Sequence, residues 1–118
     1  MENRIDQSTD TLQWIQVAHE SDIPEDEGAC VKYGDKQIAI YNFASRGEWF
    51  ATDNLCPHKK EMILSRGMLG DEKGEPKVAC PFHKRTYSLK NGKCLNDDQL
   101  VIKTYNIKVK DGFVYLLL

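Results

Sequence analysis

Two short segments carry the residue types best suited to chemistry in this chain. They are Cys56-Pro57-His58 and Cys80-Pro81-Phe82-His83. Each segment places a cysteine two or three residues before a histidine, with a proline directly after the cysteine. Thiolate and imidazole are ligands that bind iron and zinc in proteins. The sequence therefore predicts a metal centre with four ligands: Cys56, His58, Cys80 and His83.

Two kinds of centre accept two cysteines and two histidines. Structural zinc does, although its usual order pairs cysteine with cysteine and histidine with histidine. A [2Fe–2S] centre also does when two histidines replace two cysteines on one iron. Here each segment supplies one ligand of each type, so both loops can reach both irons, the cysteines binding one and the histidines the other. This alternation favours iron, and the spacing leaves zinc open.

An imidazole ligand is neutral, whereas a thiolate ligand is negative. A histidine-bound iron is therefore easier to reduce than the irons of an all-cysteine cluster, and its reduction potential is higher. A centre of this kind transfers single electrons. The sequence shows no glycine-rich dinucleotide fingerprint and no phosphate-binding loop, so we expect no complete active site in this chain.

The elements that must position the ligands are short. The 118 residues suffice for one domain, and turn signals recur at close intervals, which predicts an all-β antiparallel sandwich or barrel. One helical turn is expected over 59–64, and residues 1–10 are polar and expected to be disordered. The expected strands cover 12–18, 29–33, 37–43, 48–52, 76–79, 85–89, 100–109 and 113–118.

Composition limits the partners and the location. The net charge is −2, with no bulk basic signal for nucleic acid and no polybasic membrane anchor. No apolar run approaches the roughly 20 residues that span a bilayer. The polar start lacks the features of a signal peptide, so we expect a cytoplasmic protein. In that reducing compartment, cysteines in Cys-His pairs are metal ligands rather than disulfide partners.

The two ligand segments, followed by Tyr87 and Gly92, resemble the signature of Rieske-type [2Fe–2S] domains. Within that superfamily the chain is most similar to the small subunit of NAD(P)H-dependent nitrite reductase, in the branch that retains the ligands. The residues that carry this resemblance are 65–71, 74–76, 84–89, 91–95, 102–105 and 109–112. The resemblance implies one Rieske domain over 11–118, with a cluster-binding subdomain on two loops at about 53–90.

Several positions depart from the general Rieske pattern. Lys84 follows the second histidine, where many Rieske domains have glycine. A lysine at this position resembles the pattern of the nitrite reductase small subunits. Glu61 and Phe82 stand near the places where high-potential Rieske proteins have bridging cysteines, which implies a lower-potential centre. Cys30 and Cys94 lie outside the ligand loops, and we expect them to be small, partly buried hydrophobic residues.

The resemblance also implies a partner. Reduction of nitrite to ammonia takes six electrons, and a domain of this size cannot hold every group required. FAD, sirohaem and a further iron–sulfur cluster are therefore expected on a large catalytic subunit. The basic residues near the ligand loops form either an ordinary solvated surface, which charge alone favours, or a positive collar that would steer docking onto an acidic face of that subunit. The collar consists of Lys59, Lys60, Lys84 and Arg85.

Two other functions fit the same residues. One is a separate Rieske ferredoxin that supplies electrons to a ring-hydroxylating oxygenase. The other is a structural subunit that holds zinc or no metal. The protein that co-purifies with the chain decides the first alternative, and elemental analysis decides the second.

Overall fold

The computed structural model describes residues 12–57, 60–81, 85–97 and 99–118. Antiparallel strands dominate this part of the chain, with three single turns of 3-10 helix, η1 (Glu20–Asp22), η2 (Ala44–Arg46) and η3 (Leu64–Arg66). No helix in the described ranges is long and apolar enough to cross a bilayer. The prediction of an all-β antiparallel fold is thus confirmed.

Three sheets and one short hairpin make up the fold. The first sheet has the order β1 (Trp14–His19), β12 (Phe113–Leu117), β11 (Ile107–Lys110). The second has the order β10 (Thr104–Tyr105), β4 (Glu48–Asp53), β3 (Lys36–Phe43), β2 (Glu27–Tyr33). The third has the order β7 (Met68–Glu72), β8 (Glu75–Ala79), β9 (Thr86–Ser88), and the hairpin pairs β5 (Leu55–Cys56) with β6 (Glu61–Met62).

Strand β3 lies at the centre of the molecule and contributes to two hydrophobic cores. Successive side chains of a strand point to opposite faces. Ile38 and Ile40 therefore pack in one core with Val114 and Leu116 of β12. Ala39, Tyr41 and Phe43 pack in the other core, which also contains both cysteines of the predicted ligand set. One strand thus links the sheet at the chain ends to the predicted metal site.

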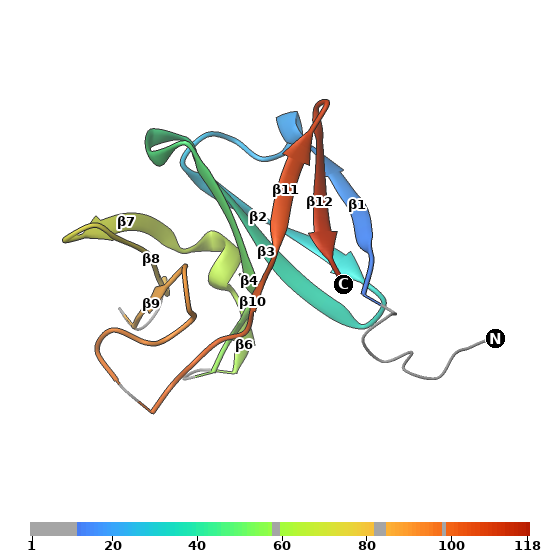
Figure 1. Ribbon diagram of the computed structural model, residues 1–118. Coiled ribbons are helices and arrows are strands. Elements are labelled where there is room, and N and C mark those ends of the chain that lie inside the picture. Colours follow the sequence, from blue (N-terminus) through green and yellow to red (C-terminus); the bar gives the residue numbers. More distant parts are fainter. Residues whose placement is uncertain (1–11, 58–59, 82–84, 98) are drawn as a thin grey trace.

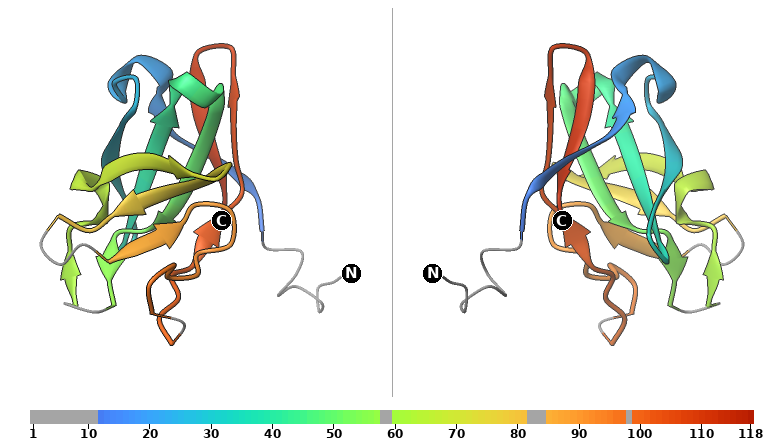
Figure 2. Two further views of the ribbon diagram at one scale, coloured as in Figure 1. Left: turned by 90° about the vertical axis from the view of Figure 1, so that its left-hand side faces the viewer. Right: turned by 90° about the vertical axis from the view of Figure 1, so that its right-hand side faces the viewer.

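The sheet of β7, β8 and β9 lies on the opposite side of the molecule from β1, β11 and β12, with the four-stranded sheet between them (Figure 1). The left view of Figure 2 shows the hairpin of β5 and β6 beside the end of β8 and the start of β9. The two predicted cysteine ligands, which end β5 and follow β8, therefore share this corner and one hydrophobic core.

Arg46 connects the hairpin of β7 and β8 to the central sheet. Its Nε donates to Glu48 at 2.7 Å, and its Nη1 donates to Asp71 and, at 3.3 Å, to the carbonyl of Gly74. Asp71 and Gly74 belong to the hairpin of β7 and β8, whereas Arg46 ends η2 after β3. One guanidinium therefore holds the far end of that hairpin against the sheet.

The ends of the described domain pair with each other. Gln13 and Leu118 exchange two backbone hydrogen bonds of 2.8 and 2.9 Å, and β1 continues the pairing with β12. Figure 1 shows this pairing at the ends of β1 and β12.

Two local predictions differ from the structure. The helical turn expected over 59–64 is wrong, because Glu61–Met62 pairs with β5 and the 3-10 turn begins only at Leu64. The single strand expected over 100–109 is two strands, because the chain leaves β4 after Tyr105 and joins β12 at Ile107. Residues 1–10, expected to be disordered, lie outside the described residues.

Candidate metal centre

The structure places the cysteine half of the predicted ligand set. Cys56 ends β5 opposite Glu61, and Cys80 directly follows β8. Their side chains are 0% and 2% exposed, and both belong to one hydrophobic core. His58 and His83 lie outside the described residues. The role of all four side chains as ligands is therefore still a prediction.

Each cysteine stands at the start of a short loop that a backbone hydrogen bond closes. The N–H of Lys60 donates to the carbonyl of Cys56 at 2.5 Å, and the N–H of Cys80 donates to the carbonyl of Arg85 at 2.8 Å. By their position in the sequence, His58 belongs to the first of these loops and His83 to the second. The folded chain therefore fixes both ends of each predicted ligand loop.

Tyr87 joins the two loops beneath the site. It lies in β9 opposite Val78, its side chain is fully buried, and its hydroxyl oxygen is 3.7 Å from the Cys56 sulfur. Burial raises the pKa of the Tyr87 phenol, and the neighbouring Cys56, Cys94 and Cys80 thiols raise it further. Tyr87 therefore stays protonated and keeps an O–H near Cys56.

Asn54 fixes the base of the β5–β6 hairpin. It precedes β5, its carbonyl accepts from the N–H of Leu64 at 3.0 Å, and its side-chain oxygen accepts from the N–H of Ser65 at 2.7 Å. The hydroxyl of Tyr41 donates to the carbonyl of Leu64 at 3.0 Å. Sequence reasoning missed both residues, since no local pattern shows that buried polar groups 11 and 23 residues apart will meet.

The two remaining thiols have different surroundings. Cys94 is buried, as expected, and its Sγ donates to Asn96 at 3.1 Å. Cys30 is exposed, so the expectation that it is partly buried is wrong. Its Sγ accepts a hydrogen bond from the Asn54 amide at 3.5 Å. The neighbouring protein atoms partly desolvate the Cys30 sulfur and so raise the pKa of this thiol, an effect that the charge of Lys32 partly offsets. Neither residue belongs to a ligand loop.

The predicted collar is described only in part. Lys59 and Lys84 lie outside the described residues. The guanidinium of Arg85 is 3.9 Å from the Asp97 carboxylate, so its charge has a partner within the chain. Docking through the collar therefore stays a prediction.

The donor chemistry of the described residues fits a metal group. Two buried sulfurs from separate loops lie around one tyrosine, and thiolates are ligands for iron–sulfur clusters and for zinc. The Nε–H of Arg85, five residues after Cys80, is buried without an acceptor in the described part of the chain. A buried donor of this kind suits a neighbouring anionic group. No three metal-binding side chains gather among the described residues, which do not include His58 and His83.

Comparison with known proteins identifies the class. The Rieske-like [2Fe-2S] domain family matches residues 13–117, and this chain belongs to that family. It is 36% identical over 104 residues to the nitrite reductase (NADH) small subunit of Escherichia coli, a match that covers 88% of this chain and 96% of the relative. The NMR structure of the Escherichia coli protein NirD superimposes with a TM-score of 0.80 at 36% identity, covering 89% of this chain and 96% of that one.

Two further relatives matter for function. The nitrite reductase [NAD(P)H] of Emericella nidulans is 39% identical over 117 residues, covering 92% of this chain but only 10% of that enzyme. The ferredoxin component of the naphthalene 1,2-dioxygenase/salicylate 5-hydroxylase systems of a Ralstonia species is 36% identical over 107 residues, covering 90% of this chain and 96% of the relative. The predicted similarity to nitrite reductase small subunits and to Rieske domains is confirmed.

Proposed function

We propose that this chain is the electron-transfer subunit of an NAD(P)H-dependent assimilatory nitrite reductase, with a Rieske [2Fe–2S] cluster bound by Cys56, His58, Cys80 and His83. The observation that carries the proposal is the burial of Cys56 and Cys80 at two closed loops around Tyr87. Similarity over 96% of an Escherichia coli small subunit supports the choice of enzyme.

When bound, the cluster supplies one-electron redox chemistry at a potential above that of an all-cysteine cluster. The chain contributes the rest. Cys56 and Cys80 hold one iron, and His58 and His83 hold the other. The buried core behind the cysteines excludes water from that side.

The partner in this proposal is the large catalytic subunit, which carries FAD, sirohaem and a further iron–sulfur cluster. A stretch similar to this chain forms 10% of the longer Emericella nidulans enzyme, which supports a domain that works beside the catalytic machinery. We place the complex in the cytoplasm, because NAD(P)H is the electron donor.

The proposal is tested on protein purified without oxygen. We expect iron and acid-labile sulfide in equal amounts, and an electron paramagnetic resonance signal after dithionite reduction. His83→Ala should abolish the signal and the visible spectrum while the circular dichroism of the β fold persists, because the outer iron loses a ligand. Zinc in place of iron would instead establish a structural subunit. A wild-type signal from the variant would remove His83 from the ligand set.

A second candidate is a ferredoxin for a ring-hydroxylating oxygenase. The observation that favours it is the 36% identity to the Ralstonia ferredoxin component, which equals the identity to the Escherichia coli small subunit. Reconstitution separates the two candidates. Stimulation of NADH-dependent nitrite reduction by the large subunit supports the proposed function, whereas electron delivery to an oxygenase alone supports the second.

A further inference from the structure

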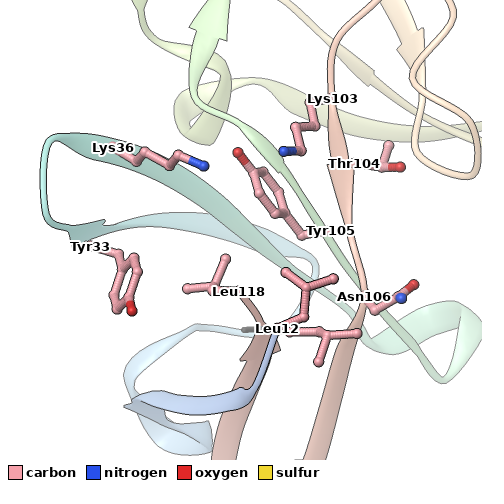
Figure 3. A pocket seen from close by; sticks show the side chains of 9 residues that line it. Leu12, Tyr33, Lys36, Lys103, Thr104, Tyr105, Asn106 and Leu118 are labelled. Atoms are coloured by element: carbon pink, nitrogen blue, oxygen red, sulfur yellow. The ribbon is translucent and has the colours of Figure 1, made fainter. Parts of the chain in front are cut away.

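A groove runs across the molecule beside the hairpin that carries Cys56. It consists of two adjoining cavities with volumes of about 270 and 300 Å³. Both cavities are lined by Lys36 at the start of β3, by Tyr105 of β10 and by Lys103, the residue that precedes β10. Figure 3 shows these three side chains converging above Leu12 and Leu118 in the first cavity.

Two ammonium groups flank one aromatic ring in this groove. The Nζ atoms of Lys36 and Lys103 are 5.9 and 5.1 Å from the centroid of the Tyr105 ring. The Tyr105 hydroxyl donates to Asp53 at 2.6 Å, which fixes the ring. Asp35 and Asp53 line the second cavity, yet neither lysine forms an ion pair with any residue that the structure describes. The groove therefore presents two cations to an incoming ligand.

Exposed apolar side chains accompany the cations. Leu12 is 55% exposed, Tyr33 43% and Met62 46%, and each lines one of the two cavities. Large apolar side chains gathered on an otherwise polar surface mark interaction sites. The combination suits a ligand with carboxylates and apolar groups in one extended chain, rather than a small inorganic anion.

The groove continues to the predicted electron-transfer site. Leu55 and Met62 line its second cavity and face each other across β5 and β6. The next pair along this hairpin is Cys56 and Glu61. A chain lying in the groove would therefore end beside the loop of Cys56, where an electron acceptor or donor must also approach.

We propose that this groove binds an extended segment of the large catalytic subunit, with carboxylates facing Lys36 and Lys103 and an apolar side chain facing Leu12 and Tyr33. This inference rests on the proposed function. A strand advances about 3.3 Å per residue, so three or four residues of such a segment reach both ammonium groups around one ring. The segment anchors the small subunit, while the ligand loops remain available for electron transfer.

The test measures binding of the cluster-loaded subunit to the purified large nitrite reductase subunit of the same organism by isothermal titration calorimetry. Combined Lys36→Glu and Lys103→Glu should weaken binding at least about tenfold, because each reversal replaces attraction by repulsion. Combined Lys73→Glu and Lys110→Glu, at two exposed lysines outside the groove, is the control with the same change of net charge and should change the affinity less than about twofold. Iron content and the paramagnetic signal should be the same in all three proteins.

A second variant tests the apolar part without changing charge. Tyr33→Ser should also weaken binding, since the exposed ring contributes contact area rather than core packing. Wild-type affinity in both the charge-reversal and the Tyr33 variants would overturn the groove proposal and leave the proposed function standing. An equal loss in the combined Lys73→Glu and Lys110→Glu variant would also overturn it, because the effect would then be one of net charge. Absence of wild-type binding to the large subunit would overturn the proposed function and this inference together.

Discussion

Tyr87 links the buried core to the predicted metal ligands. Its resemblance to an aromatic residue of the Rieske signature was visible in the sequence, four residues after His83. Its contact with Cys56 was not, because that contact joins residues 31 apart and depends on how β9 pairs with β8. Spacing thus predicted which residues can bind metal, and pairing of strands decides what surrounds them.

Removal of the Tyr87 hydroxyl should lower the reduction potential of the cluster. An O–H near a ligand sulfur stabilises the more negative reduced state, so Tyr87→Phe should lose about 1 kcal/mol of that stabilisation. For one electron this corresponds to roughly 40 mV. A redox titration followed by paramagnetic resonance measures the shift.

Tyr41→Phe is the matched control for this change. Tyr41 is an equally buried tyrosine, but its hydroxyl contacts Leu64 and Thr52 rather than a cysteine. The variant should lose about 1 kcal/mol of unfolding free energy and keep the wild-type potential. Identical potentials in the Tyr87 variant and the wild type would exclude a hydrogen bond to the loaded centre.

Elements with strong turn signals were predictable. Gly34 and Asp35 separate β2 from β3, and Gly112 follows Asp111 between β11 and β12, as expected from the sequence. The β5–β6 hairpin was missed, because two residue pairs leave no alternation to detect. Its position depends on Asn54, whose partners become neighbours only in the folded chain.

Gly92, in the loop after β9, should tolerate no side chain. It has a φ of 79°, and a Cβ there would lie 1.9 Å from the carbonyl oxygen of Ile102. Gly92→Ala should therefore cost about 3 kcal/mol of unfolding free energy, from backbone strain and displacement of that carbonyl. Urea unfolding followed by tryptophan fluorescence measures the loss.

Gly74 offers a comparison that separates strain from crowding. Its φ is 87°, but a Cβ would have no neighbour within 4 Å. Gly74→Ala should cost only about 1 kcal/mol, the strain of the left-handed backbone alone. Similar losses at the two positions would show that the Ile102 carbonyl moves without cost.

At the level of the whole molecule, β3 makes the two cores interdependent. Ile40 supports one core and Tyr41 the other, and both are fully buried. Opening either core exposes the same strand. The sequence predicted the strand but not this shared role. Its apolar run indicates that both faces of the strand are buried, but not which core each face belongs to.

One buried tyrosine, Tyr41, and one half-buried tyrosine, Tyr105, should make the protein sensitive to alkali. Burial raises the pKa of Tyr41 despite its hydrogen bond to Thr52, and burial and the Asp53 contact raise the pKa of Tyr105. An unfolded tyrosine loses its proton near pH 10. Above that pH the folded chain holds more protons than the unfolded chain, so stability is complete below about pH 10 and falls as the pH rises.

Urea midpoints measured between about pH 8 and pH 11.5 test this dependence. The wild type should lose stability over the upper part of that range. Combined Tyr41→Phe and Tyr105→Phe should be less stable at pH 8 but should show a shallower decline, since two of the titrating groups are absent. If the urea midpoints of the wild type and the variant fell in parallel with pH, the loss of stability would come from groups other than these two tyrosines.

The exchange of backbone hydrogen bonds between Gln13 and Leu118 has a consequence for how this fold can be joined to other polypeptides. A chain that enters and leaves a domain through adjacent points can be spliced into a longer protein without stretching the domain. Such an insertion would tether the domain at the free ends of β1 and β12. The same unit can thus serve as a detachable subunit or as a permanent module of a longer chain.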